Sequence, residues 1–455
     1  MTDLLAYGCS TLRDGPITPS RHSRCGTVCL VLLSLLLSQL LQGCARESAR
    51  EPVTLTLIEE WTNKAFSEGR QRELDQFTRE TGIRVTLLPS PESARDKLAL
   101  WQSLLETGAA GPDVFGIDVI WPRILNEYLI DLEPYFRKEI ALQFPAIAAS
   151  YTVGHKVVAI PYRADIGLLF YRTDLLRKYG YHAPPKTWDE LETMAARIQA
   201  GERARGRRDF WGFVWQGAAE EALACNALEW QAAAGGGRII ENDTTISVNN
   251  PRAIRSWERA AHWVGSISPP SVVGYTEWDA VNVWIAGDAA FMRNWPTAYV
   301  DSRAPDSPIR DNFDIALLPA GSAGHEGTLG GAGLAVSRFS THPREAIALV
   351  RYLSRADVQV TRSRVLSEPP TLPGLYDHPD VLAANPHFPQ VREAFRTATV
   401  SRPSNVTGKK YQAVTDAYIL AVHSVLTGRQ RAPAAAAALE RELVRLTNFR
   451  TRPPQ

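Results

Sequence analysis

Three short stretches of the chain place flat aromatic side chains next to charged or amide side chains at predicted turns. They are PYRAD (161–165), YTEWDAVNVW (275–284) and RNWPTAY (293–299). A sugar presents apolar C–H faces and a rim of hydroxyls, so flat rings can stack on the faces while carboxylate, amide and guanidinium groups hydrogen-bond the rim. These residue types therefore indicate recognition of a polyhydroxylated ligand.

The tryptophans divide into candidates for the core and candidates for a stacking surface. Trp101, Trp257 and Trp263 lie on the apolar faces of predicted helices, and we assign them to the core. Trp188, in the first turn of a predicted helix, is assigned to packing. Trp295 follows an apolar run where the chain leaves a predicted strand, and the pattern leaves both roles open.

The motifs of several enzyme classes do not occur in the sequence. There is no P-loop pattern, no H-E-x-x-H and no G-x-S-x-G, and the nine histidines show no metal-binding spacing, so we expect neither a cofactor nor a metal. The stretch GTLGGAG (327–333) precedes a predicted strand, and we interpret its glycines as turn or hinge residues. The carboxylates that could still form a glycosidase pair are Glu59, Glu60, Asp118 and Asp165.

Length and charge limit the class of protein further. The 455 residues suffice for two or three domain-sized units, or for one large domain with discontinuous parts. The chain has 50 basic and 49 acidic side chains, so nothing suggests a nucleic-acid partner.

The first elements that must position these residues alternate between strand and helix. Strands are predicted over 53–58, 83–88 and 112–118, and helices over 68–80 and 93–108. This β-α-β-α-β order requires right-handed crossovers and a parallel sheet.

Ligands of open parallel sheets bind beyond the carboxyl ends of the strands, where the chain is predicted to turn. The polar side chains that follow the first and third strands, and that we expect to gather at one edge, are Glu59, Glu60, Asn63 and Asp118. Solvated or helix-capping carboxylates are the alternative for each residue taken singly.

A second α/β region follows without a linker rich in Pro, Ser or Gly. Strands are predicted within 156–172, at the end of 277–295, and over 312–321 and 333–340, and a helix over 250–266 begins with an Asn cap and Pro. Two α/β lobes that share interwoven chain segments fit this order better than consecutive domains.

The N-terminus indicates export and lipidation. A basic segment (Arg21–Arg24) precedes an apolar run that ends in Leu-Gln-Gly-Cys at Cys44, which resembles a bacterial lipobox; a plain membrane anchor is the alternative. We predict a signal peptide over 1–43, lipidation of Cys44 and a tether over 44–51. Cys225 then remains as a lone thiol at helical spacing, and we predict that it is buried.

Several segments, in this order and spacing, resemble one family. They are DVFGIDVIWP (113–122), AIPYRADIGLLFYRTDLLRKYG (159–180), PPKTWDEL (184–191), GDAAFMRNWP (287–296) and GGAGLAVSRFSTHPREA (330–346). The chain resembles the family-1 sugar-binding group of extracytoplasmic solute-binding proteins of ABC importers, and within it the trehalose/maltose-binding branch. The resemblance covers nearly all of residues 52–450.

This resemblance implies a type II periplasmic-binding-protein fold, which consists of two α/β lobes joined by a multi-stranded hinge. It places lobe one at 52–160 with 333–368, and lobe two at 161–332 with 369–450. The side chains and backbone that it implies in ligand binding are Glu59 or Glu60, Asp118, Tyr162, Asp165, Trp278, Trp295, Gly331 and Arg402. Arg163 adds a charge beside Asp165, which would shift specificity towards an acidic or modified sugar.

The expected function is therefore capture of a sugar, such as the disaccharides trehalose or maltose, without catalysis. Hinge closure would trap the sugar, and an ABC permease of the cytoplasmic membrane would receive it. We expect a monomer held at the membrane by the lipid on Cys44. The alternatives are a lipid-anchored glycoside hydrolase and a sugar sensor without a transporter.

Overall fold

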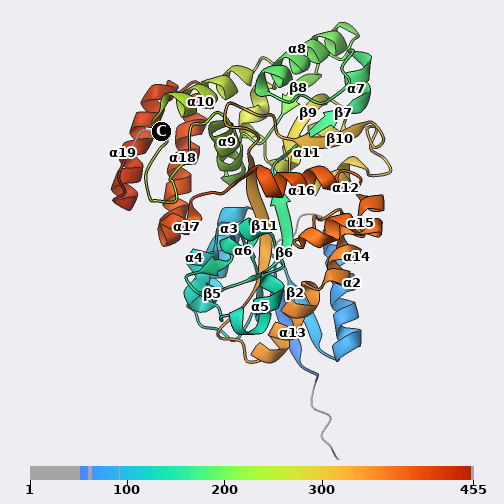
Figure 1. The fold of residues 1–455 in the computed structure, drawn as a ribbon, viewed down its shortest axis with the longest axis vertical. Coiled ribbons are helices and arrows are strands. Elements are labelled where there is room, and N and C mark those ends of the chain that lie inside the picture. Colours follow the sequence, from blue (N-terminus) through green and yellow to red (C-terminus); the bar gives the residue numbers. More distant parts are fainter. Residues whose placement is uncertain (1–51, 60–63, 92, 452–455) are drawn as a thin grey trace, which may run out of the picture. The chain divides into compact units, whose positions relative to one another are not determined.

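Two β-sheets carry the fold, and helices pack around both (Figure 1). The structure is a computed structural model that describes residues 52–59, 64–91 and 93–451. The strands of the first sheet are β1 (Thr54–Ile58), β2 (Arg84–Leu88), β3 (Val114–Asp118), β6 (Ile160–Ile166), β11 (Gly327–Val336) and β12 (Thr399–Val400). Those of the second are β7 (Leu168–Arg172), β8 (Trp211–Val214), β9 (Ala289–Asn294) and β10 (Phe313–Leu317). A separate hairpin pairs β4 (Thr152–Val153) with β5 (Lys156–Val157).

Helices connect and cover these strands. The α-helices of the first half are α2 (Lys64–Thr81), α3 (Ala94–Glu106), α4 (Pro122–Leu125), α5 (Glu133–Ile140), α6 (Pro145–Ser150), α7 (Thr173–Lys178), α8 (Trp188–Ala204) and α9 (Glu221–Ala233). Those of the second half are α10 (Pro251–Trp263), α11 (Glu277–Ile285), α12 (Ala298–Ser302), α13 (Pro343–Leu353), α14 (Ala356–Leu366), α15 (Pro379–Ala384), α16 (Phe388–Thr397), α17 (Ser404–Thr407), α18 (Tyr411–Leu426) and α19 (Ala432–Thr447). The 3-10 turns are η1 (Asn126–Tyr128), η2 (Pro270–Gly274), η3 (Pro373–Asp377) and η4 (Gly408–Lys410).

The predicted α/β class and the initial β-α-β-α-β order are confirmed. Strand β1 pairs in parallel with both β2 and β3, and α2 and α3 form the two crossovers. The Ser93 side chain caps α3, while Leu98, Trp101 and Leu105 on its apolar face are buried. Since all three strands run the same way, their carboxyl ends reach one edge of the sheet.

The chain passes from the first sheet to the second within a few residues. Strand β6 ends at Ile166 and β7 begins at Leu168, so Gly167 alone separates strands of different sheets. Strand β11 runs antiparallel beside β6, as Figure 1 shows, and pairs in parallel with β12 near its start. Residues from Val53 onward form one compact unit, and the predicted lobe boundaries stay a prediction.

The prediction that 327–333 forms a glycine-rich turn before the next strand is wrong. These residues are the first part of β11, which begins at Gly327. The glycines are there because neighbouring backbone comes very close: a Cβ on Gly331 would stand 2.4 Å from the Arg163 carbonyl oxygen, and Gly331 has a φ of +115°. A prediction from side-chain patterns misses a strand in which close backbone packing requires glycine.

The assignment of tryptophans to the core is confirmed where the structure tests it. Trp101, Trp257 and Trp263 are each at most 1% exposed, and Trp188 stacks on Trp263 with ring centroids 5.3 Å apart. Cys225 is buried, as predicted, and burial raises the pKa of its thiol to about 12, which makes it a poor nucleophile.

The N-terminal predictions concern residues outside the described ones. The signal peptide over 1–43, the lipidated Cys44 and the tether over 44–51 all belong to that segment. Among the described residues, none of the helices combines the length and apolar character needed to cross a bilayer.

Candidate functional site

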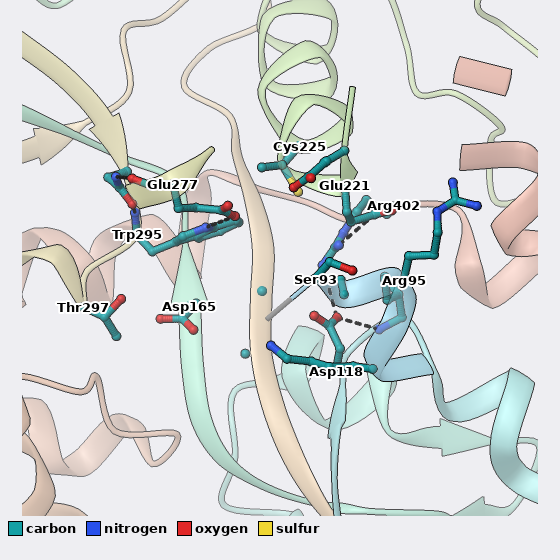
Figure 2. A pocket seen from close by; sticks show the side chains of 18 of the residues that line it. Ser93, Arg95, Asp118, Asp165, Glu221, Cys225, Glu277, Trp295, Thr297 and Arg402 are labelled. Carbon is teal, nitrogen blue, oxygen red and sulfur yellow. Dashed lines mark hydrogen bonds and ion pairs between the residues drawn. The ribbon is translucent and has the colours of Figure 1, made fainter. Parts of the chain in front are cut away.

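A cavity of about 500 Å³ lies between side chains that come from both sheets. Its size is that of a small-molecule binding site. The predicted site residues that line it are Asp118, Asp165, Trp278, Trp295, Gly331 and Arg402. The structure thus brings together six predicted residues, and Figure 2 labels four of them, Asp118, Asp165, Trp295 and Arg402.

Asp118 and Arg402 form one wall of the cavity. Asp118 is the last residue of β3, and its Oδ1 accepts hydrogen bonds from the Ile120 backbone N–H at 3.1 Å and from Arg402 Nη2 at 3.3 Å. Arg402 is 6% exposed and also donates from Nη1 to Glu221 Oε1 at 3.0 Å. Glu221 is the first residue of α9, so this arginine ties the end of a first-sheet strand to a helix that follows the second sheet's β8.

Asp165 and its neighbours form the floor. Arg163 and Asp165 stand two residues apart on β6, so their side chains share one face of the strand. Both are buried, and Arg163 Nε lies 3.2 Å from Asp165 Oδ2. Gly330 on β11 faces them, and a Cβ there would meet both the Asp165 Cβ and the Trp295 ring at 3.2 Å. The glycine therefore allows Asp165 and Trp295 to approach each other.

Trp295 follows the last residue of β9 and is half-buried. The Arg293 guanidinium carbon lies 4.1 Å from the centroid of the indole, at cation–π distance. Arg293 itself is fully buried and pairs with Glu229. Burial alone would lower the pKa of Arg293, but the Glu229 carboxylate outweighs that effect and raises it. A permanent cation thus holds one side of the ring.

Trp278 and Glu277 begin helix α11, which a capping box between Thr276 and Asp279 fixes at its start. Trp278 is 38% exposed, a large fraction for a tryptophan. Glu277 Oε1 lies 3.5 Å from the Trp295 indole nitrogen, and Figure 2 shows the two side chains next to each other. Two indoles and a carboxylate therefore share one part of the cavity.

Glu59 and Tyr162 are not among the residues that line this cavity. Tyr162 Oη donates to Glu59 Oε2 at 2.7 Å, and Glu59 Oε1 accepts from Arg70 Nε at 2.5 Å. The prediction that Glu59 joins Asp118 at the ligand edge is not met, because Arg70 on α2 draws the Glu59 carboxylate into a buried ion pair. Glu60 and Asn63 lie outside the described residues.

Sequence reasoning did not select six further carboxylates that line the cavity: Asp96, Glu220, Glu221, Glu277, Asp301 and Asp416. Glu220 and Glu221 stand where α9 begins, and Asp301 lies on α12. Burial raises the pKa of Asp301 to about 6. The available signal for two of them was the pair Glu220–Glu221 immediately before an apolar helical pattern.

The described residues contain no group of three or more His, Cys, Asp or Glu side chains placed to hold a metal ion. What the cavity does offer is hydrogen-bonding groups around a rigidly held indole. It can bind a ligand with hydroxyls and an apolar face.

Comparison with known proteins identifies the class. The family model for bacterial extracellular solute-binding proteins matches residues 74–390, and the chain belongs to this family. A probable ABC transporter-binding protein of Deinococcus radiodurans is 44% identical over 404 residues, covering 88% of this chain and 96% of the relative.

Solved structures of similar proteins share the fold. Maltose-bound MalE3 of T. maritima superposes with a TM-score of 0.80 at 32% identity, over 87% of this chain and all of the other. The GacH receptor of Streptomyces glaucescens, solved unliganded and with acarbose, gives 0.77 at 25% identity, over 88% of this chain and all of the other. The predicted family, the periplasmic-binding-protein fold and a binding rather than catalytic role are thereby confirmed.

Proposed function

We propose that this chain captures a sugar in the cavity and delivers it to the permease of an ABC importer, and that the sugar is a disaccharide such as trehalose or maltose. The observation that carries the proposal is the Trp295 indole, held by Arg293 next to Asp165 in a cavity of about 500 Å³. A flat ring beside carboxylates matches the apolar face and hydroxyl rim of a sugar. The maltose bound by MalE3 supports the same choice.

Capture would proceed by closure of two lobes, 52–160 with 333–368 and 161–332 with 369–450. Side chains from both sheets line the cavity, so a ligand that contacts both would bind the closed state better than an open one. Gly167, between strands of different sheets, is a place where the backbone could absorb such a motion.

Membership of an extracellular family supports export across the cytoplasmic membrane. We propose that a signal peptide over 1–43 directs this export, and that Cys44 then carries a lipid. The tether over 44–51 would let the binding protein reach its permease as a monomer.

Calorimetric titration with trehalose, maltose and small oligosaccharides tests the proposal. We expect a Kd in the micromolar range or below for at least one of them, which corresponds to about −8 kcal/mol or better. If no sugar in the panel gives heat or a change in tryptophan fluorescence, the proposal fails. Analysis of the titrated samples should show the sugar unchanged.

Trp295→Ala should weaken binding by about tenfold to a hundredfold, because a stacked ring contributes about 1–3 kcal/mol. The free energy of unfolding should change by less than about 2 kcal/mol, since the ring is half-buried. Trp211→Ala is the matched control: Trp211 is also half-buried and carries an arginine, Arg203, 4.2 Å from its centroid, but it does not line the cavity. Equal loss of binding in both variants would contradict the stacking role.

A further inference from the structure

The cavity is strongly acidic although the whole chain is balanced. The chain has 50 basic and 49 acidic side chains, whereas the described residues that line the cavity include eight carboxylates and four basic side chains. The carboxylates are Asp96, Asp118, Asp165, Glu220, Glu221, Glu277, Asp301 and Asp416. The basic side chains are Arg95, Lys97, Arg163 and Arg402.

Three of the four basic side chains already pair with carboxylates of the same cavity. Arg163 pairs with Asp165, and Arg95 with Asp416. Arg402 pairs with both Asp118 and Glu221. Lys97, the fourth, is buried on α3. Arg163 by itself would favour an anionic sugar. Because Asp165 neutralises its charge, the cavity does not favour a ligand of that class.

The charged groups that act on Glu220 are all acids, whereas Glu277 also lies within electrostatic reach of the buried Arg293, which Glu229 already pairs. Burial raises the pKa of Glu220, and the remaining contributions come from Glu277, Asp96 and Asp279, which all act in the same direction. Both glutamates stand where a helix begins, Glu220 at the cap of α9 and Glu277 as the first residue of α11. Each carboxylate is therefore held at the start of a helix in the cavity wall.

A second observation, on Arg402, points to a ligand at the cavity wall. Arg402 is 6% exposed, lines the cavity, and its Nε–H has no acceptor among the described residues. A buried donor without an acceptor is costly, and a ligand hydroxyl would satisfy it. The site thus offers an unused donor and more carboxylates than basic side chains, which together suit a ligand with hydroxyls and a cation.

We propose that the saccharide bound here carries a protonated amino group, and that Glu220 and Glu277 receive it beside the indoles of Trp278 and Trp295. The inference rests on the proposed function, because it names the class of sugar that the same cavity takes. A charge-assisted hydrogen bond is about twice as strong as a neutral one, and an indole face adds cation–π attraction. A neutral sugar in the same cavity would make neither the charge-assisted hydrogen bond nor the cation–π contact.

Calorimetry with matched ligands tests this: trehalose and maltose against their 2-amino-2-deoxy derivatives, at pH 7 and at low and high salt. We expect the better amino derivative to bind about tenfold more tightly than its neutral parent, with the advantage shrinking at high salt. Glu277→Gln and Glu220→Gln should each weaken the amino derivative more than the neutral parent, so that most of the tenfold advantage is lost. Glu258→Gln, an exposed change on α10, is the control and should alter neither affinity.

The possible results separate the two proposals. Equal affinity for amino and neutral sugars overturns the amine assignment and leaves sugar capture intact. Equal weakening of both ligand types in Glu277→Gln and Glu220→Gln also overturns it, since the carboxylates would then accept only hydroxyls. If neither ligand type binds to a wild-type protein that melts cooperatively, sugar capture itself is wrong.

Discussion

Acidification should destabilise this protein through His387, a buried histidine at the start of α16. His387 occupies the N-cap position of α16 without a side-chain capping bond, is 1% exposed, and neither of its ring nitrogens has a hydrogen-bond partner among the described residues. Its ring lies on Tyr299 with centroids 4.0 Å apart. Burial, and then the charge of Arg303, lower the pKa of His387 from 6.5 to about 3.

The sign and size of the effect follow from proton linkage. The unfolded chain binds a proton at His387 below pH 6.5, while the folded chain rejects it until about pH 3. The stabilising contribution is therefore fully present above pH 6.5 and is lost as the pH falls towards 3. Each pH unit in this window corresponds to about 1.4 kcal/mol, so lowering the pH from 7 to 5 should cost about 2 kcal/mol.

Urea unfolding of the wild type and of His387→Phe at pH 7 and pH 5 measures this contribution. Phe keeps the ring contact with Tyr299 and cannot be protonated, so the wild type should lose about 2 kcal/mol more than the variant over this interval. Burial raises the pKa of Asp301 to about 6, which stabilises the folded chain as the pH falls, but this effect is common to both proteins and cancels in the difference. The exposed His262 provides the control substitution His262→Phe. Parallel loss in wild type and His387→Phe would refute the assignment of a neutral, buried imidazole.

Two further predictions concern the residues that shape the cavity. Gly331→Ala should lower the free energy of unfolding, measured by urea titration, by at least about 2 kcal/mol. The reason is that φ is +115° and the new Cβ would stand 2.4 Å from the Arg163 carbonyl oxygen. Gly274→Ala is the control and should be near neutral, because the space around Gly274 is open. Arg402→Met should cost about 3–5 kcal/mol and abolish sugar binding because Asp118 and Glu221 lose their buried cation, while Arg95→Met, which breaks the exposed pair with Asp416, should cost less than about 1 kcal/mol. Equal effects within either pair of variants would contradict the corresponding reasoning.

The parallel strands could be predicted from the sequence because their β-branched, apolar residues suit the buried sheet in which they lie. The β-branched run over 53–58 became β1 at Thr54–Ile58, and 83–88 became β2 at Arg84–Leu88. The glycine-rich start of β11 was misread because glycine has a low strand propensity, while the close approach of β6 requires glycine there. Local preference and tertiary packing disagree at this point, and packing decides.

Only part of the residues that line the candidate site could be predicted, again because tertiary packing decides where side chains lie. Strand order fixes which residues reach the edge of a sheet, but not where each side chain turns. Asp118 turns to Arg402 at the cavity, whereas Glu59 turns to Arg70, a residue of α2 whose position the strand argument does not include. Glu277 was missed because its importance comes from Trp295, which is close in space and 18 residues away in the chain.

The orientation of the Trp295 ring is set by the residue two positions before it. Side chains alternate along β9, so Arg293 and Trp295 emerge on the same side, and the guanidinium packs against the indole at 4.1 Å. Arg293 is fixed in turn by its buried pair with Glu229, whose Oε1 also accepts the Thr328 backbone N–H of β11 at 3.0 Å. The ring is thereby held in one orientation before any ligand arrives, so little conformational entropy remains to be lost on binding. A half-buried tryptophan fixed in this way suits the stacking role that we propose for it, and β11, the strand that accepts this anchoring, also carries Gly330 and Gly331 into the cavity.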